Sequence, residues 1–450
     1  MVQSTILRSG SLAVLGLGTT GLSCVRYLRQ QGYAVTVFDT RTCPPEAERC
    51  RQEFPEVQII LGELKAEALQ CFDELVVSPG LSIQENPLAA LKAAGHSIIG
   101  DIELFVRQAQ APIVAITGSN AKSTVTTLLG EMAAEAGVRV AVGGNLGLPA
   151  LELLAPAVEL YVLELSSFQL ETTHALQAKV ATILNISEDH LDRYTSMQAY
   201  HQTKQRIYRN AHSAVYNRKD PLTAPLLPAQ VPVQSFASDV PSLGQWGIGT
   251  EAGQQWLMHG RDKILAVSQL RIKGQHNALN ALAALAIGTL AGLPLAAMQT
   301  TLKKFAGLEH RCQEVRTLEA VTYYDDSKGT NVGATVAAIA GLAAAGHSGI
   351  VIILGGIGKG QDFAPLTEPI RQHGRAVVLM GVDAPLIAAV LPAEVPVYWM
   401  SGMQKAVQCA QQQARPGDAV LLSPACSSFD MFKDYHDRGR QFVQAVEALR

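Results

Sequence analysis

The sequence lacks the features that mark disulfide-rich, zinc-binding, nucleic-acid-binding and disordered proteins. Its 7 cysteines are scattered, odd in number and never in a C-x-x-C pair, which is typical of reduced thiols in a cytosolic chain. Charged residues make up only 17% of the chain and hydrophobic residues 48%, so we expect a globular protein. The 36 basic and 39 acidic residues leave a formal charge of −3. Because no basic run is present either, we expect no nucleic-acid or anionic-membrane partner.

The N-terminus also lacks the long apolar core of a signal peptide. Two stretches carry no Asp, Glu, Lys or Arg, over residues 274–302 and 329–358. A membrane interpretation is disfavoured, because the first contains Asn277 and Asn280 and the second is broken by a Gly-His-Ser-Gly turn. We therefore predict two buried Ala-rich helices, the second followed by a strand, in a cytoplasmic chain without membrane insertion.

The length of 450 residues is too great for one core. Apolar strands alternate with helical stretches along the chain, which predicts α/β units whose parallel sheets bind ligands at the carboxyl ends of their strands. We predict an α/β fold of three domains: a Rossmann-like N-terminal domain over residues 1–100, a central P-loop ATPase-type domain over 101–306, and a Rossmann-like C-terminal domain over 307–450. Residues 220–260 are rich in Pro and Gly and predict irregular β structure, as a small sheet.

The first block opens with a G-x-G-x-x-G motif at Gly16, Gly18 and Gly21, directly after an apolar strand. Asp39 ends the next strand about 20 residues later, where a carboxylate can meet a ribose. The motif is weak on its own. It fits an NAD(P)-dependent oxidoreductase, another nucleotide ligand, or a tight turn that packs a helix on a sheet.

The second block contains the most informative segment, Ala-Ile-Thr-Gly-Ser-Asn-Ala-Lys-Ser-Thr over residues 115–124, between an apolar strand and a helical pattern. Backbone N–H groups and the helix N-terminus can hold phosphates there. Lys122 can reach the outer phosphates and Ser123 can bind Mg²⁺. Ile116 and Ala121 stand where the strict phosphate-loop pattern has Gly. The segment favours ATP binding over an ordinary Lys at a helix start, and leaves open a regulatory protein that binds nucleotide without chemistry.

Three further features of this block point to ligands. Glu164 ends a strand beside the phosphate loop, where it can bind Mg²⁺ directly or through water. His190 lies among acidic residues after the next strand, which indicates a metal or phosphate site or else a polar helix start capped by Ser187. Asn277 and Asn280 share one helix face and could cap a turn or contact an adenine or ribose.

In the third block, polar residues follow three separate strands. Asp326 and Lys328 follow one strand, Lys359 lies in a Gly-rich turn after another, and Ser423 follows a third. Together they indicate a binding edge for an anionic small molecule, although a lysine at a strand end is more often simply solvated.

In combination and order, these motifs resemble the Mur ligases, cytoplasmic enzymes that add amino acids to the peptidoglycan precursor. The phosphate loop is similar to that family's T-G-x-N-G-K-[ST], with Ala121 in place of the usual Gly. Residues 164–170, 189–193, 326–328 and 423–430 resemble the family member that adds D-glutamate. The matching motifs run from residue 16 to residue 440, over nearly the whole chain.

The resemblance implies an ATP- and Mg²⁺-dependent amide ligase that joins D-glutamate to UDP-N-acetylmuramoyl-L-alanine. ATP would convert the substrate carboxylate, a poor electrophile, into an acyl phosphate that the D-glutamate amine attacks. We expect a monomer with small-molecule substrates. Another amide ligase of this architecture, either a different Mur ligase or a folylpolyglutamate synthase, stays open as an alternative.

Carried over residue by residue, the resemblance also implies the contacts of ATP and metal. ATP would contact Gly118, Ser119, Asn120, Ala121, Lys122, Ser123, Thr124, Asn277, Asn280, Arg311, Asp326 and Lys328. The Mg²⁺ ligands would be Ser123, Glu164, His190 and Lys204, and the catalytic residues Lys122, His190 and Lys204. Lys204 matches a lysine that the family carbamylates, which turns a cation into a carboxylate-like metal ligand. By sequence alone it is an ordinary helix-surface lysine.

The two other substrates have their own implied contacts. The UDP substrate would contact Gly18, Thr19, Thr20, Asp39, Thr40, Arg41, Ser78, Asn145 and His190. D-Glutamate would contact Thr330, Lys359, Ser423 and Phe429, with Lys359 opposing its side-chain carboxylate.

Two positions depart from the family pattern. Ala121 adds a methyl group where Gly is usual, so we expect the loop to pass there without a positive φ. Gly329 stands where Ala is common, and we expect this difference to have little effect.

Overall fold

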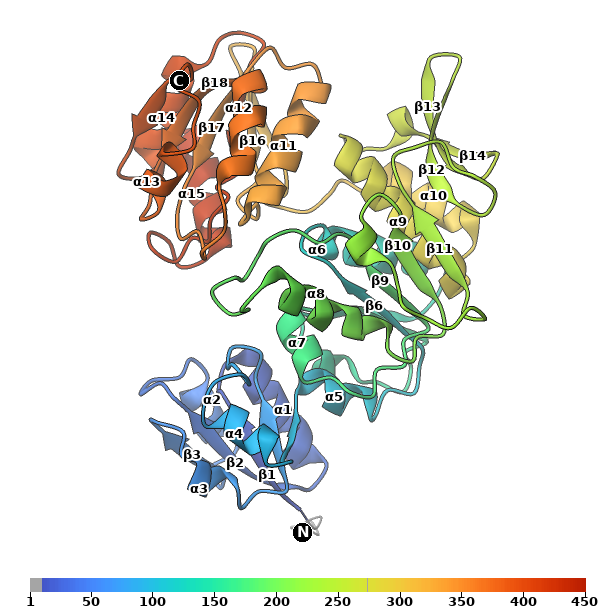
Figure 1. Cartoon of the computed structure of the whole chain (residues 1–450), viewed down its shortest axis with the longest axis vertical. Helices are drawn as coiled ribbons and strands as arrows, with labels where there is room; N and C mark the ends of the chain where they lie inside the picture. The colour runs from blue at the N-terminus through green and yellow to red at the C-terminus, as the bar shows by residue number, and fades with distance from the viewer. Residues whose placement is uncertain (1–9, 273) are drawn as a thin grey trace.

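The computed structural model describes residues 10–272 and 274–450, which fold into three α/β units. The N-terminal and C-terminal units lie at opposite ends of the molecule and the middle unit lies between them (Figure 1). Their sheets have five, nine and six strands. The α/β fold class predicted from the sequence is confirmed.

The N-terminal unit is a five-stranded parallel sheet in the order β3-β2-β1-β4-β5. Its strands are β1 (Ser11–Leu15), β2 (Ala34–Asp39), β3 (Gln58–Leu61), β4 (Glu74–Val77) and β5 (Ser97–Ile99). Its helices are α1 (Thr19–Gln30), α2 (Ala47–Glu53), α3 (Ala66–Leu69) and α4 (Leu88–Ala93). The central strand β1 is apolar and almost entirely buried, as expected for a parallel strand covered on both faces.

The middle unit is built on a nine-stranded sheet in the order β14-β13-β12-β11-β10-β9-β6-β8-β7. Its strands are β6 (Ile113–Thr117), β7 (Val140–Gly144), β8 (Leu160–Glu164), β9 (Val180–Ile183), β10 (Ala214–Asn217), β11 (Val233–Phe236), β12 (Trp246–Glu251), β13 (Gln254–His259) and β14 (Asp262–Ala266). Its helices are α5 (Asp101–Val106), α6 (Lys122–Glu135), α7 (Ser167–Glu171), α8 (Met197–Gln205), α9 (Gln275–Ala291) and α10 (Leu295–Lys304). Strand β6 lies between β8 and β9, so the segments that follow these three strands meet at one edge.

The Pro- and Gly-rich segment does not form a separate small sheet. Strand β11 continues the parallel run from β10, and β12 joins it through the pair Phe236 and Trp246 before turning back in antiparallel hairpins. Trp246 is only 1% exposed, because it packs into the main core of this unit. Burial of this large side chain explains why these strands extend the central sheet.

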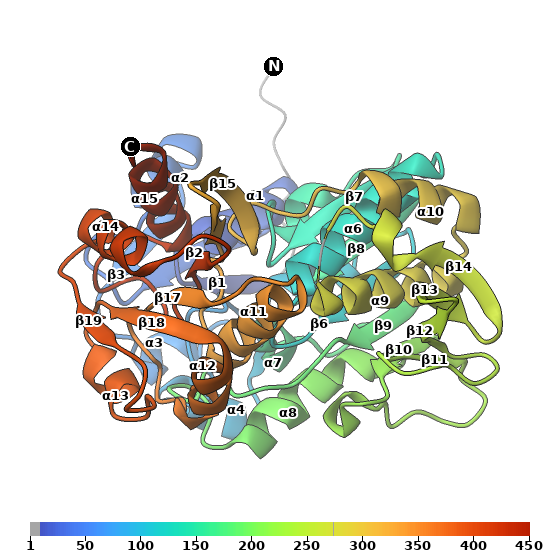
Figure 2. The ribbon, with the colours of Figure 1, turned by 90° about the horizontal axis from the view of Figure 1, so that it is seen from above.

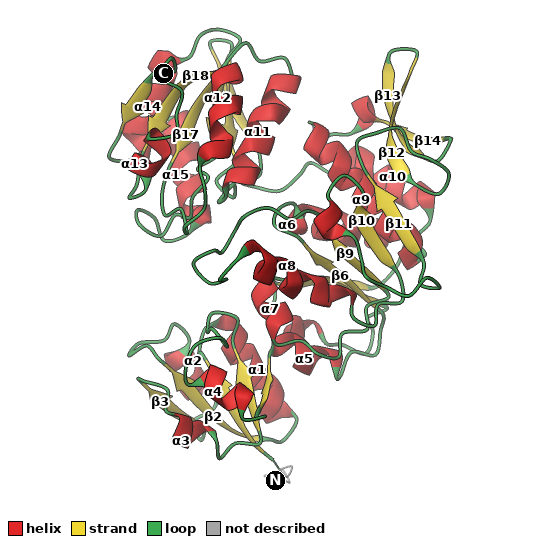
Figure 3. Cartoon of the chain, viewed as in Figure 1, coloured by secondary structure: helices red, strands yellow, loops and turns green. Residues whose placement is uncertain are grey.

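The C-terminal unit has a six-stranded sheet in the order β15-β16-β20-β17-β18-β19, parallel except for the edge strand β15. Its strands are β15 (Gln313–Leu318), β16 (Val321–Asp325), β17 (Ile350–Leu354), β18 (Gly374–Leu379), β19 (Val397–Trp399) and β20 (Ala419–Leu422). Its helices are α11 (Val332–Ala344), α12 (Thr367–His373), α13 (Ala384–Ala388), α14 (Met403–Gln413) and α15 (Tyr435–Glu447). Helices α11 to α13 cover one face of the sheet, and α14 and α15 cover the other (Figure 3).

The two stretches without charged residues are folded as helices packed within the units. The first forms α9 and α10 rather than a single helix, because Gly292 ends α9 with a φ of +88° and Pro294 precedes α10. The second forms α11 and then β17. Helix α9 of the middle unit contacts α11 of the C-terminal unit, and the two lie side by side when the molecule is seen from above (Figure 2). In the described residues, no helix combines the length and apolarity needed to cross a membrane.

The G-x-G-x-x-G motif brings α1 against the turn that follows β1. A Cβ atom added at Gly21 would lie 1.9 Å from the carbonyl oxygen of Gly16, whereas one added at Gly18 would meet nothing within 4 Å. Ser78 donates a hydrogen bond of 2.9 Å to the same Gly16 carbonyl. The third glycine of the motif is therefore fixed by helix–strand contact, whatever ligand the turn holds.

We predict that Gly21→Ala destabilises the N-terminal unit by about 1–3 kcal/mol, because the methyl group forces α1 away from β1. The measurement is the thermal unfolding midpoint of the whole chain. Gly18→Ala is the matched control and should leave that midpoint nearly unchanged. Equal effects of the two substitutions would contradict the packing argument.

Candidate active site

The segment between β6 and α6 forms a phosphate-loop-like turn anchored to the strand beside it. Ser119 N–H donates to the carbonyl of Asn185 at 2.9 Å, and Asn120 N–H donates to the side-chain oxygen of Asn185 at 2.8 Å. Ala121 ends the turn with φ +67° and ψ −5°. The expectation that this position avoids positive φ is therefore wrong: the chain needs a left-handed residue to turn into α6, and alanine adopts it at a cost of about 1–2 kcal/mol.

Lys122 folds back over the loop that carries it. Its Nζ donates to the carbonyl oxygens of Gly118 at 2.9 Å and Ser119 at 3.0 Å. Burial lowers the pKa of Lys122, and the charges of Arg311 and Lys359 lower it further, while Glu164 opposes the shift. Both hydrogen bonds that Lys122 Nζ makes within the described residues are accepted by carbonyl oxygens, so an anion bound there would gain a charged donor.

Glu164, at the end of β8, presents an unsatisfied carboxylate oxygen at the same edge. Its Oε1 accepts a hydrogen bond from Asn145 at 2.7 Å, while Oε2 is buried without a partner. Burial raises the pKa of Glu164, but the charge of Lys122 and the interactions with Ser123 and Asn145 outweigh it and hold the pKa below its usual value. Ser123, on the next turn, accepts a hydrogen bond of 2.6 Å from Arg311 of the C-terminal unit. An ionised, orphaned oxygen beside a hydroxyl suits a hard cation.

No group of three or more His, Cys, Asp and Glu side chains in residues 10–272 and 274–450 is arranged to hold a metal ion. This does not conflict with a magnesium site, because Mg²⁺ commonly takes one or two protein carboxylates and fills its remaining positions with water and phosphate oxygens.

Lys204 lies under the loop rather than on the surface. It is 1% exposed, and its Nζ donates to the carbonyl of Gly118 at 2.9 Å and to Thr117 Oγ1 at 3.2 Å. Burial, followed by the charge of Lys122, lowers the pKa of Lys204 well below its usual value. The interpretation of Lys204 as a helix-surface lysine is wrong, because α8 packs against the end of β6 along the side that carries it.

His190 and Asp189 connect this edge to the C-terminal unit. The ring of His190 packs against Phe168 with centroids 4.7 Å apart, and its Nε2 lies 3.6 Å from Asp189 Oδ2. Burial lowers the pKa of His190 to about 4, although Asp189 opposes the shift. The imidazole is therefore neutral at pH 7. Asp189 also pairs with Lys359 at 2.9 Å, a contact between the middle and C-terminal units.

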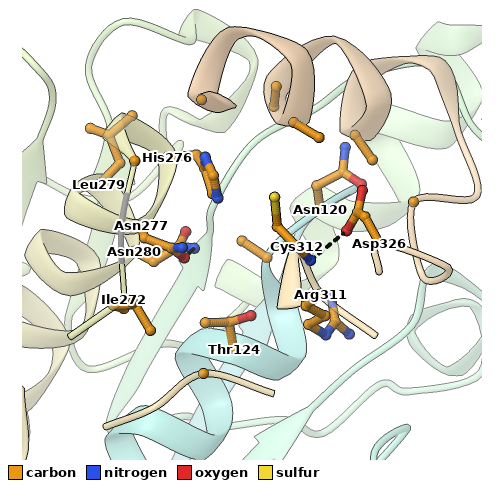
Figure 4. Close-up of a pocket in the computed structure, with 18 of the residues that line it drawn as sticks. Asn120, Thr124, Ile272, His276, Asn277, Leu279, Asn280, Arg311, Cys312 and Asp326 are labelled. Carbon is orange, nitrogen blue, oxygen red and sulfur yellow. Dashed lines mark hydrogen bonds between the residues drawn. The ribbon is translucent and has the colours of Figure 1, made fainter. Parts of the chain in front are cut away.

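A cavity of about 810 Å³ lies beside the phosphate loop, between α9 and α11 (Figure 4). It brings together many of the residues that were expected to contact ATP: Asn120, Ala121, Thr124, Asn277, Asn280, Arg311, Asp326 and Lys328. The Nδ2 of Asn280 donates to Asn277 Oδ1 at 3.1 Å, so one helix face carries a linked amide pair. Asn120, which lines the cavity, forms a reciprocal amide pair with Asn331 at 3.2 and 3.0 Å.

The polar floor of the cavity is contributed by the segment after β16. Asp326 accepts a hydrogen bond of 2.7 Å from Ser423, and burial raises its pKa to about 7. Lys328 lies 3.9 Å from the centroid of the Tyr435 ring, and burial, then the charge of Arg311, lowers its pKa to about 8. A Cβ added at Gly329 would lie 2.5 Å from Asp326 Oδ2 and 2.7 Å from Ser423 Oγ. Glycine at position 329 avoids this contact, whereas alanine would need the bonded pair of Asp326 and Ser423 to shift.

Comparison with known proteins assigns the chain to a family. Three domain families match it in order: the MurD-like N-terminal domain of Mur ligases over residues 10–100, the Mur ligase middle domain over 116–288, and the glutamate ligase domain of Mur ligases over 310–426. The chain belongs to the Mur ligase family. The resemblance found in the sequence is confirmed, and the oxidoreductase interpretation of the G-x-G-x-x-G motif loses its support.

Similar proteins carry the names of Mur ligases. The UDP-N-acetylmuramoylalanine–D-glutamate ligase of Pseudomonas aeruginosa is 56% identical over 436 residues, 97% of each chain. The protein of that name from Acinetobacter baylyi is 52% identical over 448 residues, 99% of each chain. In structure, MurC of Thermotoga maritima matches with a TM-score of 0.62 and 17% identity, over 98% of this chain and 99% of that one. MurF of T. maritima, solved with ADP, matches with a TM-score of 0.59 and 15% identity, over 99% and 96%.

In this Mur ligase the N-terminal residues expected to contact UDP lie around the end of β1 and β2. Asp39 is buried, and it accepts hydrogen bonds from Leu17 N–H at 2.6 Å and from the Arg41 guanidinium at 2.7 and 2.9 Å. These partners hold the pKa of Asp39 below its usual value against the effect of burial. Gly18 precedes α1 without a side-chain cap, so the N–H groups of the first turn have no partner from that residue.

The remaining residues expected to contact the UDP substrate or D-glutamate lie in different units and differ in exposure. Asn145 lies in the middle unit of the Mur ligase, bonded to Glu164. Phe429 is 72% exposed and does not line the large cavity. Thr330 is half-buried and Thr40 is exposed.

Sequence reasoning missed one residue of the cavity that stands out in the structure. His276 lines the cavity from the start of α9, and its Nδ1 is buried without a partner (Figure 4). A Cβ added at Gly341 of α11 would lie 3.0 Å from this nitrogen. Its place directly before Asn277 was the available signal, but a lone histidine at a helix start has no distinguishing pattern.

We predict that Ala121→Gly raises the thermal unfolding midpoint, because relief of about 1–2 kcal/mol of left-handed strain exceeds the added chain entropy of about 0.5–1 kcal/mol. Ala136→Gly, at the other end of the same helix with φ −77°, is the matched control and should lower the midpoint. Equal destabilisation by both substitutions would show that Ala121 is not strained.

Proposed function

We propose that the chain joins D-glutamate to UDP-N-acetylmuramoyl-L-alanine at the expense of ATP, in cytoplasmic synthesis of the peptidoglycan precursor. The observation that carries the proposal is the shared edge of β6, β8 and β9, where the phosphate loop, Lys122 and the orphaned oxygen of Glu164 meet. The names of relatives that are 52–56% identical over nearly the whole chain support the choice of amino acid.

The chemistry needs charge neutralisation more than a strong base. The substrate carboxylate attacks the γ-phosphorus of ATP, ADP leaves, and the D-glutamate amine then attacks the acyl carbon and expels phosphate. Negative charge gathers first on the transferred phosphoryl group and then on the tetrahedral carbon centre. Lys122 and the loop N–H groups would meet the first charge, and the neutral imidazole of His190 would donate a hydrogen bond to a substrate carboxylate.

The donor set fits Mg²⁺ as the cation of this reaction. Bound Mg²⁺ would offset the charge of the transferring phosphoryl oxygens. Glu164 would offer its unpartnered Oε2, Ser123 its hydroxyl, and His190 and a modified Lys204 would complete the set. The present bond from Arg311 to Ser123 would have to shift when a cation takes that hydroxyl.

Lys204 is suited to carbamylation. The depressed pKa favours the neutral amine, whose nitrogen can attack the carbon of CO₂ and lose a proton to form a carbamate. The product exchanges a cation that is repelled by Lys122 for an anion that is attracted to it. This change would also add an oxygen ligand beside the phosphate loop.

The remaining residues would hold the substrates. Asn277, Asn280, Arg311, Asp326 and Lys328 would surround the nucleoside of ATP in the large cavity. The UDP group would lie at the end of β1 and β2, against the residues named for it from the sequence. D-Glutamate would contact Thr330, Ser423 and Phe429, and its side-chain carboxylate would replace Asp189 at Lys359.

This division assigns one ligand to each expected domain. Residues 1–100 would bind the UDP substrate, residues 101–306 ATP, and residues 307–450 the incoming amino acid together with part of ATP. The chain would act as a monomer, because every group that the chemistry requires comes from one copy.

The deciding experiment measures phosphate release from ATP with UDP-N-acetylmuramoyl-L-alanine and single amino acids. We expect release with D-glutamate and not with L-glutamate. Release with another amino acid would assign a different Mur ligase activity. Lys122→Ala should reduce turnover by at least 100-fold, because such a phosphate contact is worth several kcal/mol. Near-normal turnover in this variant would remove the role of the loop.

We predict that Lys204→Ala loses activity and that acetate or a similar anion partly restores it, because a small carboxylate can take the place of the carbamate. The measurement is the same phosphate release with and without added acetate. Lys122→Ala is the matched control, because an anion cannot replace the cation lost there. Full activity of Lys204→Ala, or rescue of both variants alike, would contradict the carbamate role.

A further inference from the structure

A second cavity, of about 520 Å³, lies between the N-terminal unit and α8. Gln84 contributes to it from the N-terminal unit, and residues 193–209 form the rest of its wall. Three of its lining side chains are arginines, at positions 193, 206 and 209, and no lining residue is Asp or Glu. It shares no lining residue with the large cavity beside the phosphate loop.

The first arginine, Arg193, connects the middle unit to the N-terminal unit through hydrogen bonds. Its guanidinium donates to the carbonyl oxygens of Pro79 and Leu81, each at 2.8 Å, and to Glu171 Oε2 at 3.1 Å. Its Nε is buried and has no partner. Burial, followed by the charge of Glu171, raises the pKa of Tyr194, the next residue.

The other two arginines contribute to the cavity from the end of α8 and the turn that follows it. Arg206 donates to the carbonyl of Thr173 at 3.0 Å and lies 3.3 Å from His174 Nδ1, while its Nε is buried and unpartnered. Burial lowers the pKa of Arg206, and the neighbouring charge of Arg209 lowers it further, while the carboxylate of Glu171 opposes the shift. Like charges that are partly removed from water are costly unless an anion pairs with them.

We propose that this cavity binds an organic diphosphate. A guanidinium forms paired hydrogen bonds to phosphate oxygens, and the two of Arg206 and Arg209 match the charges of a diphosphate better than the single charge of a carboxylate, while Arg193 is already paired with Glu171. The volume lies within the usual range of small-molecule sites. Gln84, Gln202 and Tyr194 offer further hydrogen-bonding groups around the arginines.

The position of the cavity gives its occupant a structural effect. Gln84 belongs to the N-terminal unit, whereas Arg206 and Arg209 belong to the middle unit, so a bound diphosphate bridges the two. The opposite side of α8 carries Lys204, which contacts the phosphate loop. Occupancy therefore fixes the N-terminal unit against the helix that supports the candidate active site.

The test is equilibrium binding of labelled inorganic pyrophosphate to the whole chain, with saturating ADP present to fill the phosphate loop. We expect Arg206→Gln/Arg209→Gln to bind one equivalent fewer than the unaltered protein. Arg209→Gln alone, at an exposed position, should fold normally and weaken that equivalent about tenfold. Arg139→Gln/Arg261→Gln removes two exposed arginines of the same unit and should bind as the unaltered protein does.

Equal binding by the unaltered protein and the Arg206 and Arg209 variants would overturn the proposal, and so would equal losses in the test and control pairs. Competition with UDP then separates the two sources of a diphosphate. Displacement of the Arg206-dependent equivalent by UDP identifies a nucleotide-linked diphosphate. If pyrophosphate binds there and UDP does not displace it, the proposal that the ligand is an organic diphosphate is overturned. Because only binding is measured, the result does not depend on whether the chain ligates D-glutamate.

Discussion

Buried positive charge without matching negative charge is the constraint on which this site depends. Lys122, Lys204 and Arg311 are brought together where burial lowers the pKa of each. Glu164 is ionised nearby, but Oε2 has no hydrogen bond. Such an arrangement costs free energy that a bound polyphosphate and its cation would offset. The fold supplies this free energy through its buried hydrophobic clusters, so the site itself can remain poorly satisfied.

The middle and C-terminal units are held together by polar contacts that a ligand can replace. Lys359 reaches Asp189, Arg311 reaches Ser123, and the amides of Asn120 and Asn331 pair, each across the boundary between the middle and C-terminal units. These are polar contacts between groups that face the candidate ligands. An apolar interface would hold the units regardless of ligand, whereas each of these polar contacts can exchange its partner for a ligand.

The fold was more accessible from the sequence than the site was. Apolar strands alternating with helices gave three parallel α/β units, and the phosphate loop and Glu164 followed from strand ends that share one edge. Lys204 was not accessible, because its burial depends on how α8 packs against β6 and the helix sequence is polar. The left-handed backbone of Ala121 was hidden for another reason: residue preference argues against it, and the geometry of the turn overrides that preference.

The uncharged stretch over residues 329–358 shows how composition and structure can point in different directions. Its helix α11 looks like a buried or membrane-directed segment by hydropathy, yet Gly333, Ala337, Gly341 and Ala345 lie four residues apart and line the large cavity. Because these side chains are small, Gly341 of α11 can lie against His276 of α9. The small side chains also leave the space beside this contact open to a ligand. The absence of charge and bulk on this helix is therefore explained by the cavity it forms. Larger residues along the same face would fill the space in which Asn277 and Asn280 face Asp326.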